Sequence, residues 1–75
     1  MTRWIASGFN IETGELWRLE ERDRAGAEHA ASSWLEDKPI GSLADVLQSR
    51  ETDHGHQTNM VTSYKRVLGG VELKS

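Results

Sequence analysis

The stretch DRAGAEHAASSWLED, residues 23–37, decides the fold of this chain. Its apolar residues recur at the spacing of one face of an α-helix and are Ala27, Ala30, Ala31, Trp34 and Leu35. Asp23 is a suitable N-cap, and the Lys38-Pro39 pair is a suitable stop. The residues that we expect on the solvent side are Glu28, Ser32, Ser33 and Glu36. This pattern predicts one helix that lies closely on a sheet and is anchored by Trp34.

The length of 75 residues indicates a single domain, residues 1–75. This is near the smallest size at which a hydrophobic core is stable without disulfides or a structural metal. The chain has no cysteine, so disulfides and thiolate metal ligands are excluded, and we expect the cytoplasm as its compartment. The net charge of −3 disfavours nucleic acid and anionic membranes as direct partners, because both attract basic proteins. No segment is apolar over a length that would span a bilayer.

Residues 3–9 and 15–21 have the composition of two strands, and residues 10–14 have that of a hairpin connection. A three-residue loop, Glu12-Thr13-Gly14, predicts the cross-strand pairs Phe9–Trp17, Ser7–Leu19 and Ile5–Glu21. It also gathers four large apolar residues on the face toward the helix: Ile5, Phe9, Trp17 and Leu19. A two-residue Thr13-Gly14 turn would separate Phe9 from Trp17, so we prefer the first register.

The preferred register fixes the outer face of this hairpin. We expect it to contain Trp4, Ala6, Gly8 and Asn10 with Leu16, Arg18, Glu20 and Arg22. Trp4 would then lie among charges, either as a cover for the sheet edge or as an anchor for a binding partner.

The second half of the chain predicts further strands. Residues 42–52 fit a short helix or a strand, and we favour a strand over Ala44–Glu51. A loop at Thr52–Asn59 would join it to a strand at Met60–Leu68, and residues 69–73 could pair once more at an edge. The fold class is therefore α+β, with a ββαββ order and one helix on one face of an antiparallel sheet. The expected core is Trp34, Trp17, Phe9, Leu19, Leu35 and Ala31, joined by Val46, Val61 and Val67.

Asp53-His54-Gly55-His56 is the one cluster of metal-ligand types in the sequence. Either Asp53 or Glu51 would have to complete a site with the two histidines on a flexible tip, whereas a metal centre needs three or four ligands. We expect a solvated loop here, with no metal and no cofactor. No nucleophile motif, P-loop or dinucleotide fingerprint occurs either, so we do not expect an enzyme.

Two resemblances bear on function. Gly69-Gly70 behind a strand, with the opening hairpin and helix, resembles ubiquitin-like β-grasp modifiers, although five residues follow the glycines. In overall layout, the Ala-rich segment 27–35 and the close of the chain at 71–73 are similar to small phage and mobile-element proteins, especially anti-CRISPR inhibitors. The second resemblance implies stoichiometric blockade of a CRISPR surveillance complex or nuclease in the cytoplasm of a bacterial host. Such targets have basic channels that a modestly acidic surface could engage.

We therefore expect a protein-binding inhibitor or accessory protein of the anti-CRISPR kind, with a ubiquitin-like modifier or another small interaction domain as the alternative. The expected partner-binding residues are Trp4, Arg18, Glu20, Arg22, Glu28 and Glu36. Trp4 and Arg18 are the anchors in this hypothesis, and the carboxylates are charge partners for a basic groove. The oligomeric state is left open.

The helix assignment makes the first testable prediction. Trp34→Ala should unfold or nearly unfold the domain, because removing a large core aromatic costs about 3–5 kcal/mol and a domain this small is stable by about as much. Thermal denaturation measures the effect. A cooperative melt with an unchanged midpoint would contradict the assignment.

Overall fold

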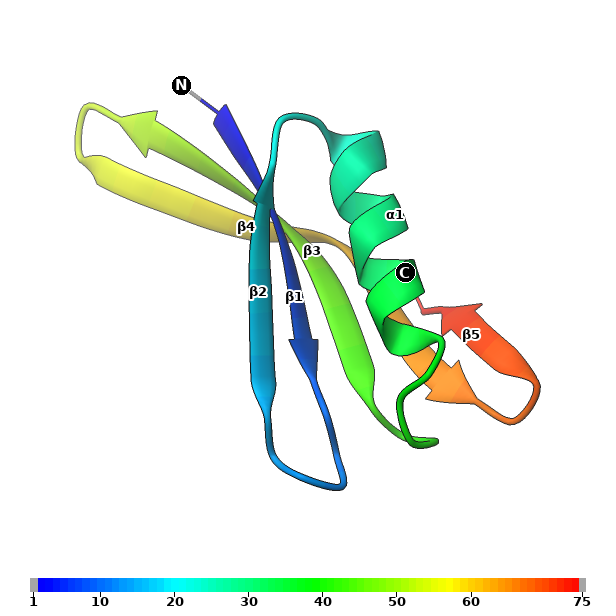
Figure 1. The fold of residues 1–75 in the computed structure, drawn as a ribbon. Helices are drawn as coiled ribbons and strands as arrows, with labels where there is room; N and C mark the ends of the chain where they lie inside the picture. Colours follow the sequence, from blue (N-terminus) through cyan, green and yellow to red (C-terminus); the bar gives the residue numbers. More distant parts are fainter. Residues whose placement is uncertain (1, 75) are drawn as a thin grey trace.

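The part of the chain that the structure describes folds as a sheet with one helix, which confirms the α+β class. The structure is a computed structural model that describes residues 2–74. Its elements in order are β1 (Thr2–Phe9), β2 (Leu16–Glu21), α1 (Arg24–Leu35), β3 (Leu43–Thr52), β4 (Gly55–Val67) and β5 (Gly70–Leu73) (Figure 1). The predicted ββαββ order is therefore present and is extended by a fifth strand, formed by the C-terminal segment that we expected to pair at an edge.

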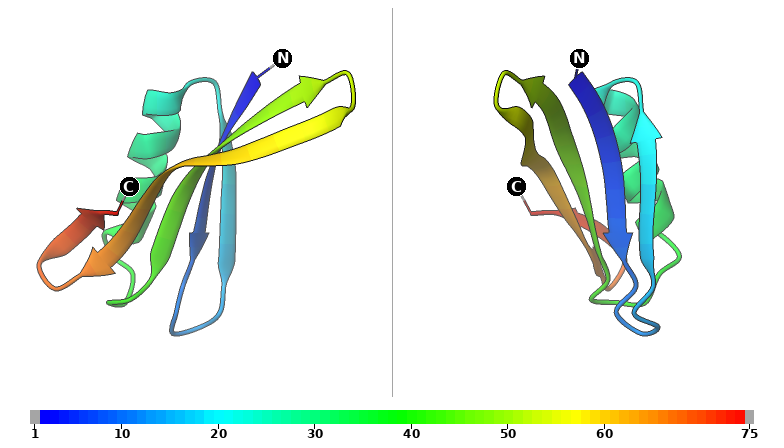
Figure 2. Two further views of the ribbon diagram at one scale, coloured as in Figure 1. Left: turned by 180° about the vertical axis from the view of Figure 1, so that it is seen from behind. Right: turned by 90° about the vertical axis from the view of Figure 1, so that its left-hand side faces the viewer.

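The five strands form one sheet in the order β2-β1-β3-β4-β5, and all neighbouring pairs are antiparallel. Helix α1 packs mainly on β1 and β3 and lies on one face only, as the edge-on view in Figure 2 shows. The choice of a strand for residues 42–52 is confirmed. The described chain is elongated, with extents of 43 × 23 × 18 Å, because β3 and β4 run past the end of the helix.

Helix α1 begins and buries its face as the sequence predicts. Asp23 is the N-cap, and its Oδ1 accepts a hydrogen bond of 2.7 Å from the backbone N–H of Gly26. Ala27, Ala31 and Leu35 are fully buried. Small residues at the first two of these positions bring the helix axis close to the sheet, which leaves little room for larger side chains beneath it.

The first hairpin differs from the prediction by one residue. The connecting loop has four residues, Ile11–Gly14, because Asn10 still pairs with Glu15: the Asn10 N–H donates to the Glu15 carbonyl at 2.9 Å. The Asn10 side chain accepts from the backbone N–H groups of Glu12 and Thr13, which is an Asx turn. Gly14 completes the loop with a φ of 77°. The expected three-residue loop is therefore wrong.

This one-residue change inverts β1 relative to β2, because side chains alternate between faces. Gly8, and not Phe9, stands opposite Trp17. Trp4, Ala6 and Gly8 therefore face the helix, whereas Ile5 and Phe9 face away from it. The predicted core position of Phe9 and the predicted outer position of Trp4 are both wrong, while Trp17 does lie on the helix side.

Two stacked indoles join the hairpin to the helix. The rings of Trp17 and Trp34 lie 5.1 Å apart between centroids, with only 8° between their planes. The six-membered ring of Trp34 rests directly on Gly8, where a Cβ atom would overlap it. The ammonium of Lys38 lies 4.8 Å from the centroid of the Trp34 ring. A glycine in this central strand is therefore a packing requirement.

The buried core is smaller in side-chain volume than predicted. It contains Ala6, Ala27, Ala31, Leu35, Ala44 and Val46, with Trp4, Trp17, Trp34, Val61, Tyr64 and Val71 packed around it. Leu19 lies on the helix side of the edge strand but is 41% exposed, so its predicted central place is wrong. Val67, also predicted, is not part of this cluster.

The polar segment Thr52–Asn59 was predicted to be a loop, and this is wrong. Strand β4 starts at Gly55, and only Asp53 and His54 form the turn between Thr52 and Gly55. Backbone pairing of β3 and β4 thus continues through residues 55–59 of β4, whose side chains are all exposed. A register shift opposite Val46 and Leu47 leaves Val61 as an extra residue, a β-bulge beside the core.

Packing at Gly8 makes a prediction about stability. Gly8→Ala should lower the free energy of unfolding by about 1–3 kcal/mol, because the new methyl group forces the Trp34 ring out of its stack. Gly70→Ala is the matched control, since Gly70 is also a strand residue but has open space at its Cβ position. Urea unfolding measures both, and equal stability of the two variants would contradict this packing.

Candidate protein-binding surface

The sheet face opposite α1 carries no helix among the described residues, and we call it the uncovered face. Figure 2 (left) shows it from the front, with the helix behind the strands. Cross-strand pairing arranges its side chains in rows. One row is Leu16, Phe9, Leu43, Lys65 and Glu72; the next is Arg18, Ser7, Asp45 and Ser63; the third is Glu20, Ile5, Leu47 and Met60. Apolar residues of three adjacent strands, β2, β1 and β3, therefore stand side by side at the loop end of this face.

The apolar row continues onto the adjoining loops. The β1–β2 loop and the α1–β3 connection lie at the same end of the molecule (Figure 1), where the Ile11 N–H donates to the Ser42 Oγ at 3.2 Å. The Ile11 side chain is next to Gly41, which Ile40 precedes. We define the apolar end as the exposed residues Phe9, Ile11, Leu16, Ile40 and Leu43. Leu16 is the most exposed of them, at 78%.

Four exposed carboxylates lie in the two connections at the same end of the molecule as the apolar end. Glu12 and Glu15 lie in the β1–β2 loop, and Glu36 and Asp37 begin the α1–β3 connection. Lys38 donates a hydrogen bond of 3.0 Å to Asp37, and this bond together with the lysine charge lowers the pKa of that carboxyl. Lys65 stands beside Leu43 in the apolar row, so the acidic part of this edge is at the two connections.

The six predicted partner-binding residues do not form one surface. Arg18 and Glu20 do share the uncovered face. Trp4 is half-buried on the helix side, Arg22 is in the loop before α1, and Glu36 is at the end of α1. Their role in binding stays a prediction, but the expected grouping of Trp4 with Arg18 is wrong because of the loop-length error.

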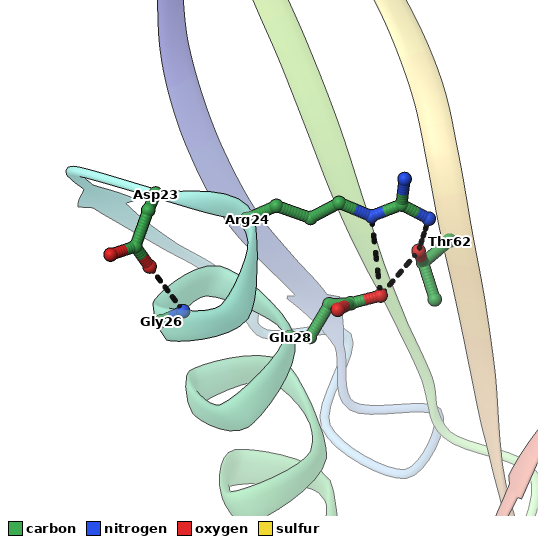
Figure 3. A network of polar contacts seen from close by, with 5 residues as sticks. All are labelled: Asp23, Arg24, Gly26, Glu28 and Thr62. Atoms are coloured by element: carbon green, nitrogen blue, oxygen red, sulfur yellow. Dashed lines mark hydrogen bonds and ion pairs between the residues drawn. The ribbon is translucent and has the colours of Figure 1, made fainter.

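Glu28 belongs to a partly exposed polar network between α1 and β4 (Figure 3), so it does not point freely into solvent as predicted. The buried Thr62 hydroxyl donates to Glu28 Oε2 at 2.9 Å, and Arg24 lies 3.5 Å from the same oxygen. Arg24 also donates to Thr62 at 3.3 Å. Thr62 is a polar residue in a buried strand position, so it needs such partners, and they connect α1 to β4.

His54 and His56, the two histidines of the predicted loop, do not lie in a cluster of metal ligands among the described residues. Within residues 2–74, no group of three or more histidines and carboxylates is placed to hold a metal ion. His54 is in the β3–β4 turn. His56 lines a depression of about 120 Å³ with Arg3, Ser49 and Glu51 on the uncovered face.

The two glycines near the C-terminus are part of the sheet. Leu68 and Gly69 form the turn between β4 and β5, where Gly69 has a φ of 91°. Gly70 pairs with Val67, and its carbonyl accepts a hydrogen bond of 2.9 Å from Arg66. A modifier of the ubiquitin-like kind would need these glycines in a free tail, so the geometry does not favour that alternative.

Sequence reasoning missed Phe9 and Leu43 as surface residues. The signal that could have found them is Asn10, whose side chain caps a four-residue loop and so sets the register.

Comparison of the chain with known protein families, curated proteins and solved structures gave no match. No helix within residues 2–74 is long and apolar enough to cross a membrane.

Tyr64 makes a prediction about pH. Burial, and secondly the charge of Glu28, raise the pKa of its phenol, while Arg24 acts in the opposite direction. Below about pH 10 the phenol is neutral in both the folded and the unfolded chain; above it, the unfolded chain ionises first. The free energy of unfolding should therefore fall as the pH rises through this range. The Tyr64→Phe variant, which lacks this phenol, should lose less of its free energy of unfolding. Urea unfolding of both proteins at about pH 9 and about pH 11 tests this, and equal losses would contradict it.

Proposed function

We propose that this protein is a small protein-binding inhibitor or accessory protein that docks on its partner through the apolar end. The observation that supports the proposal is the row Leu16, Phe9 and Leu43, which lies in solvent across three adjacent strands. Contiguous apolar patches on a free surface mark interaction sites, because leaving them in water costs about 25 cal/mol for each Å².

The size of the molecule suits such a role. A standard interface takes about 800 Å² from each partner, and the accessible surface of the chain is 5033 Å². Docking would therefore use about a sixth of the surface. The apolar end and its neighbouring polar rows on the uncovered face together resemble the apolar centre and polar rim of a protein interface.

The acidic edge indicates the chemistry of the partner. Glu12, Glu15, Glu36 and Asp37 would face the rim of the interface, so a partner with a basic surface around an apolar patch is favoured. Nucleic-acid-binding channels of proteins have such basic rims. Together with the resemblance to anti-CRISPR inhibitors, this makes a CRISPR effector complex the partner that we propose, blocked by occupation of its surface and without catalysis.

The test compares two exposed leucines. Leu16→Ser should weaken binding to a purified CRISPR effector by about tenfold or more, as loss of an interface anchor does. Leu68→Ser is the control, because Leu68 is 88% exposed and lies in the β4–β5 turn, so both changes spare the core. Immobilised protein first captures effectors from a lysate of host cells, and titration with the purified effector then gives the dissociation constants.

Two further readouts separate the outcomes. Inhibition of target cleavage should require about one protein per effector, as expected for blockade, and Glu12→Lys should reduce the rate of association at low salt. Capture of no effector, or equal affinity of the Leu16 and Leu68 variants, would defeat the proposal. Inhibition at far less than one protein per effector would contradict action by binding.

A further inference from the structure

We propose that the free edge of β2 pairs antiparallel with the same edge of a second copy, joining two sheets into one. Strand β2 is at the end of the strand order, so one side of its backbone has no strand neighbour among the described residues. The hydrogen bond from Asn10 N–H to Glu15 O sets the alternation along the hairpin. The N–H and C=O groups of Arg18 and Glu20 consequently point to the free edge.

The sequence of this edge is complementary to itself. If the two-fold axis passes through Leu19, then Arg18 of each copy stands opposite Glu20 of the other, which gives two opposite-charge pairs. An axis through Arg18 would oppose two arginines, and one through Glu20 would oppose two glutamates. Like charges directly opposite destabilise a strand pair, so the first of these three registers is favoured.

The two faces of the strand fit this register. Arg18 and Glu20 are both on the uncovered face, so the charge pairs would form there. Leu19 points to the helix side, where its 41% exposed side chain would meet the same residue of the second copy. Glu20 has a partner in the monomer, Arg3 at 3.4 Å, but both side chains are more than half exposed and such a pair is weak.

Helix α1 packs mainly on β1 and β3 and less on β2, which it contacts through the Trp34–Trp17 stack. It therefore covers one face of the sheet and, within the described residues, leaves the outer backbone edge of β2 open (Figure 1). The two-fold axis would place the two apolar ends at opposite ends of the joined sheet and leave both uncovered faces on the same side. Self-association is therefore separate from the proposed partner binding. An edge contact is also small, so we expect a dissociation constant in the micromolar range.

Cross-linking tests the register. The chain has no cysteine, so a single substitution introduces the only thiol. Under mild oxidation, Leu19→Cys should form a disulfide dimer, because directly opposite residues at the axis have Cα atoms about 4.5 Å apart. Arg18→Cys is the matched control: its two copies would be diagonal neighbours about 7–8 Å apart, too far for a disulfide without backbone movement. Equal dimer yields from the two variants would overturn this register.

A charge swap tests the pairing without a covalent bond. Sedimentation velocity over a micromolar to near-millimolar series should show a monomer–dimer equilibrium for the unmodified protein. Arg18→Glu and Glu20→Arg should each weaken dimerisation by about tenfold or more, and the double variant should restore it. Glu72→Arg, an equivalent change on β5 at the opposite edge, should leave the dimer constant unchanged.

Three results would overturn the proposal. The first is a monomer at every concentration. The second is a dimer that the single charge reversals do not weaken or that the double variant does not restore. The third is a dimer that Phe9→Ser abolishes while the charge reversals leave it intact, since this would assign the contact to the uncovered face. Thermal melts of each variant exclude unfolding as the cause of a lost dimer.

Discussion

The contact between Trp34 and Gly8 is the constraint on which the rest of this structure depends. The indole of Trp34 rests on the bare backbone of β1 and stacks on Trp17 of β2, so one side chain joins the helix to both strands of the first hairpin. Two alanines, Ala27 and Ala31, permit the same close approach along the helix. The core is therefore thin, and large aromatic surfaces at its border contribute area that small buried residues cannot.

The length of one loop decides what this protein shows to solvent. With three loop residues, Phe9 would join the core and Trp4 would lie outside; with four, the reverse holds. Counting apolar residues favoured the three-residue loop, because it gathered four large side chains on one face. The four-residue loop forms nevertheless, because the Asn10 side chain caps it with two hydrogen bonds. A local hydrogen-bond preference thus set the composition of two opposite faces.

Helix α1 could be predicted from the sequence because its spacing, N-cap and stop agree at every level. The sequence predicts β3 to within one residue of its bounds at each end and predicts the apolar part of β4, but it places a loop where the polar start of β4 lies. Residues 55–59 are exposed on both faces, so backbone pairing and the short turn hold them in a strand without any hydrophobic pattern. The site was hardest to predict, because the wrong register assigned Phe9 to the core and separated it from Leu16, which was expected on the outer face and is its true cross-strand partner.

The small residues that let the helix lie close to the sheet also explain why the candidate site exists. A helix can cover only one face, and Gly8 and Ala6 leave β1 with no large side chain there other than Trp4. The larger residues of β1, Ile5 and Phe9, are displaced to the uncovered face. Ile5 is only 4% exposed, since Glu20 and Leu47 flank it on the neighbouring strands. Phe9 is at the loop end, where its neighbours Leu16 and Leu43 are themselves exposed, so the surplus apolar surface of a one-helix fold collects there.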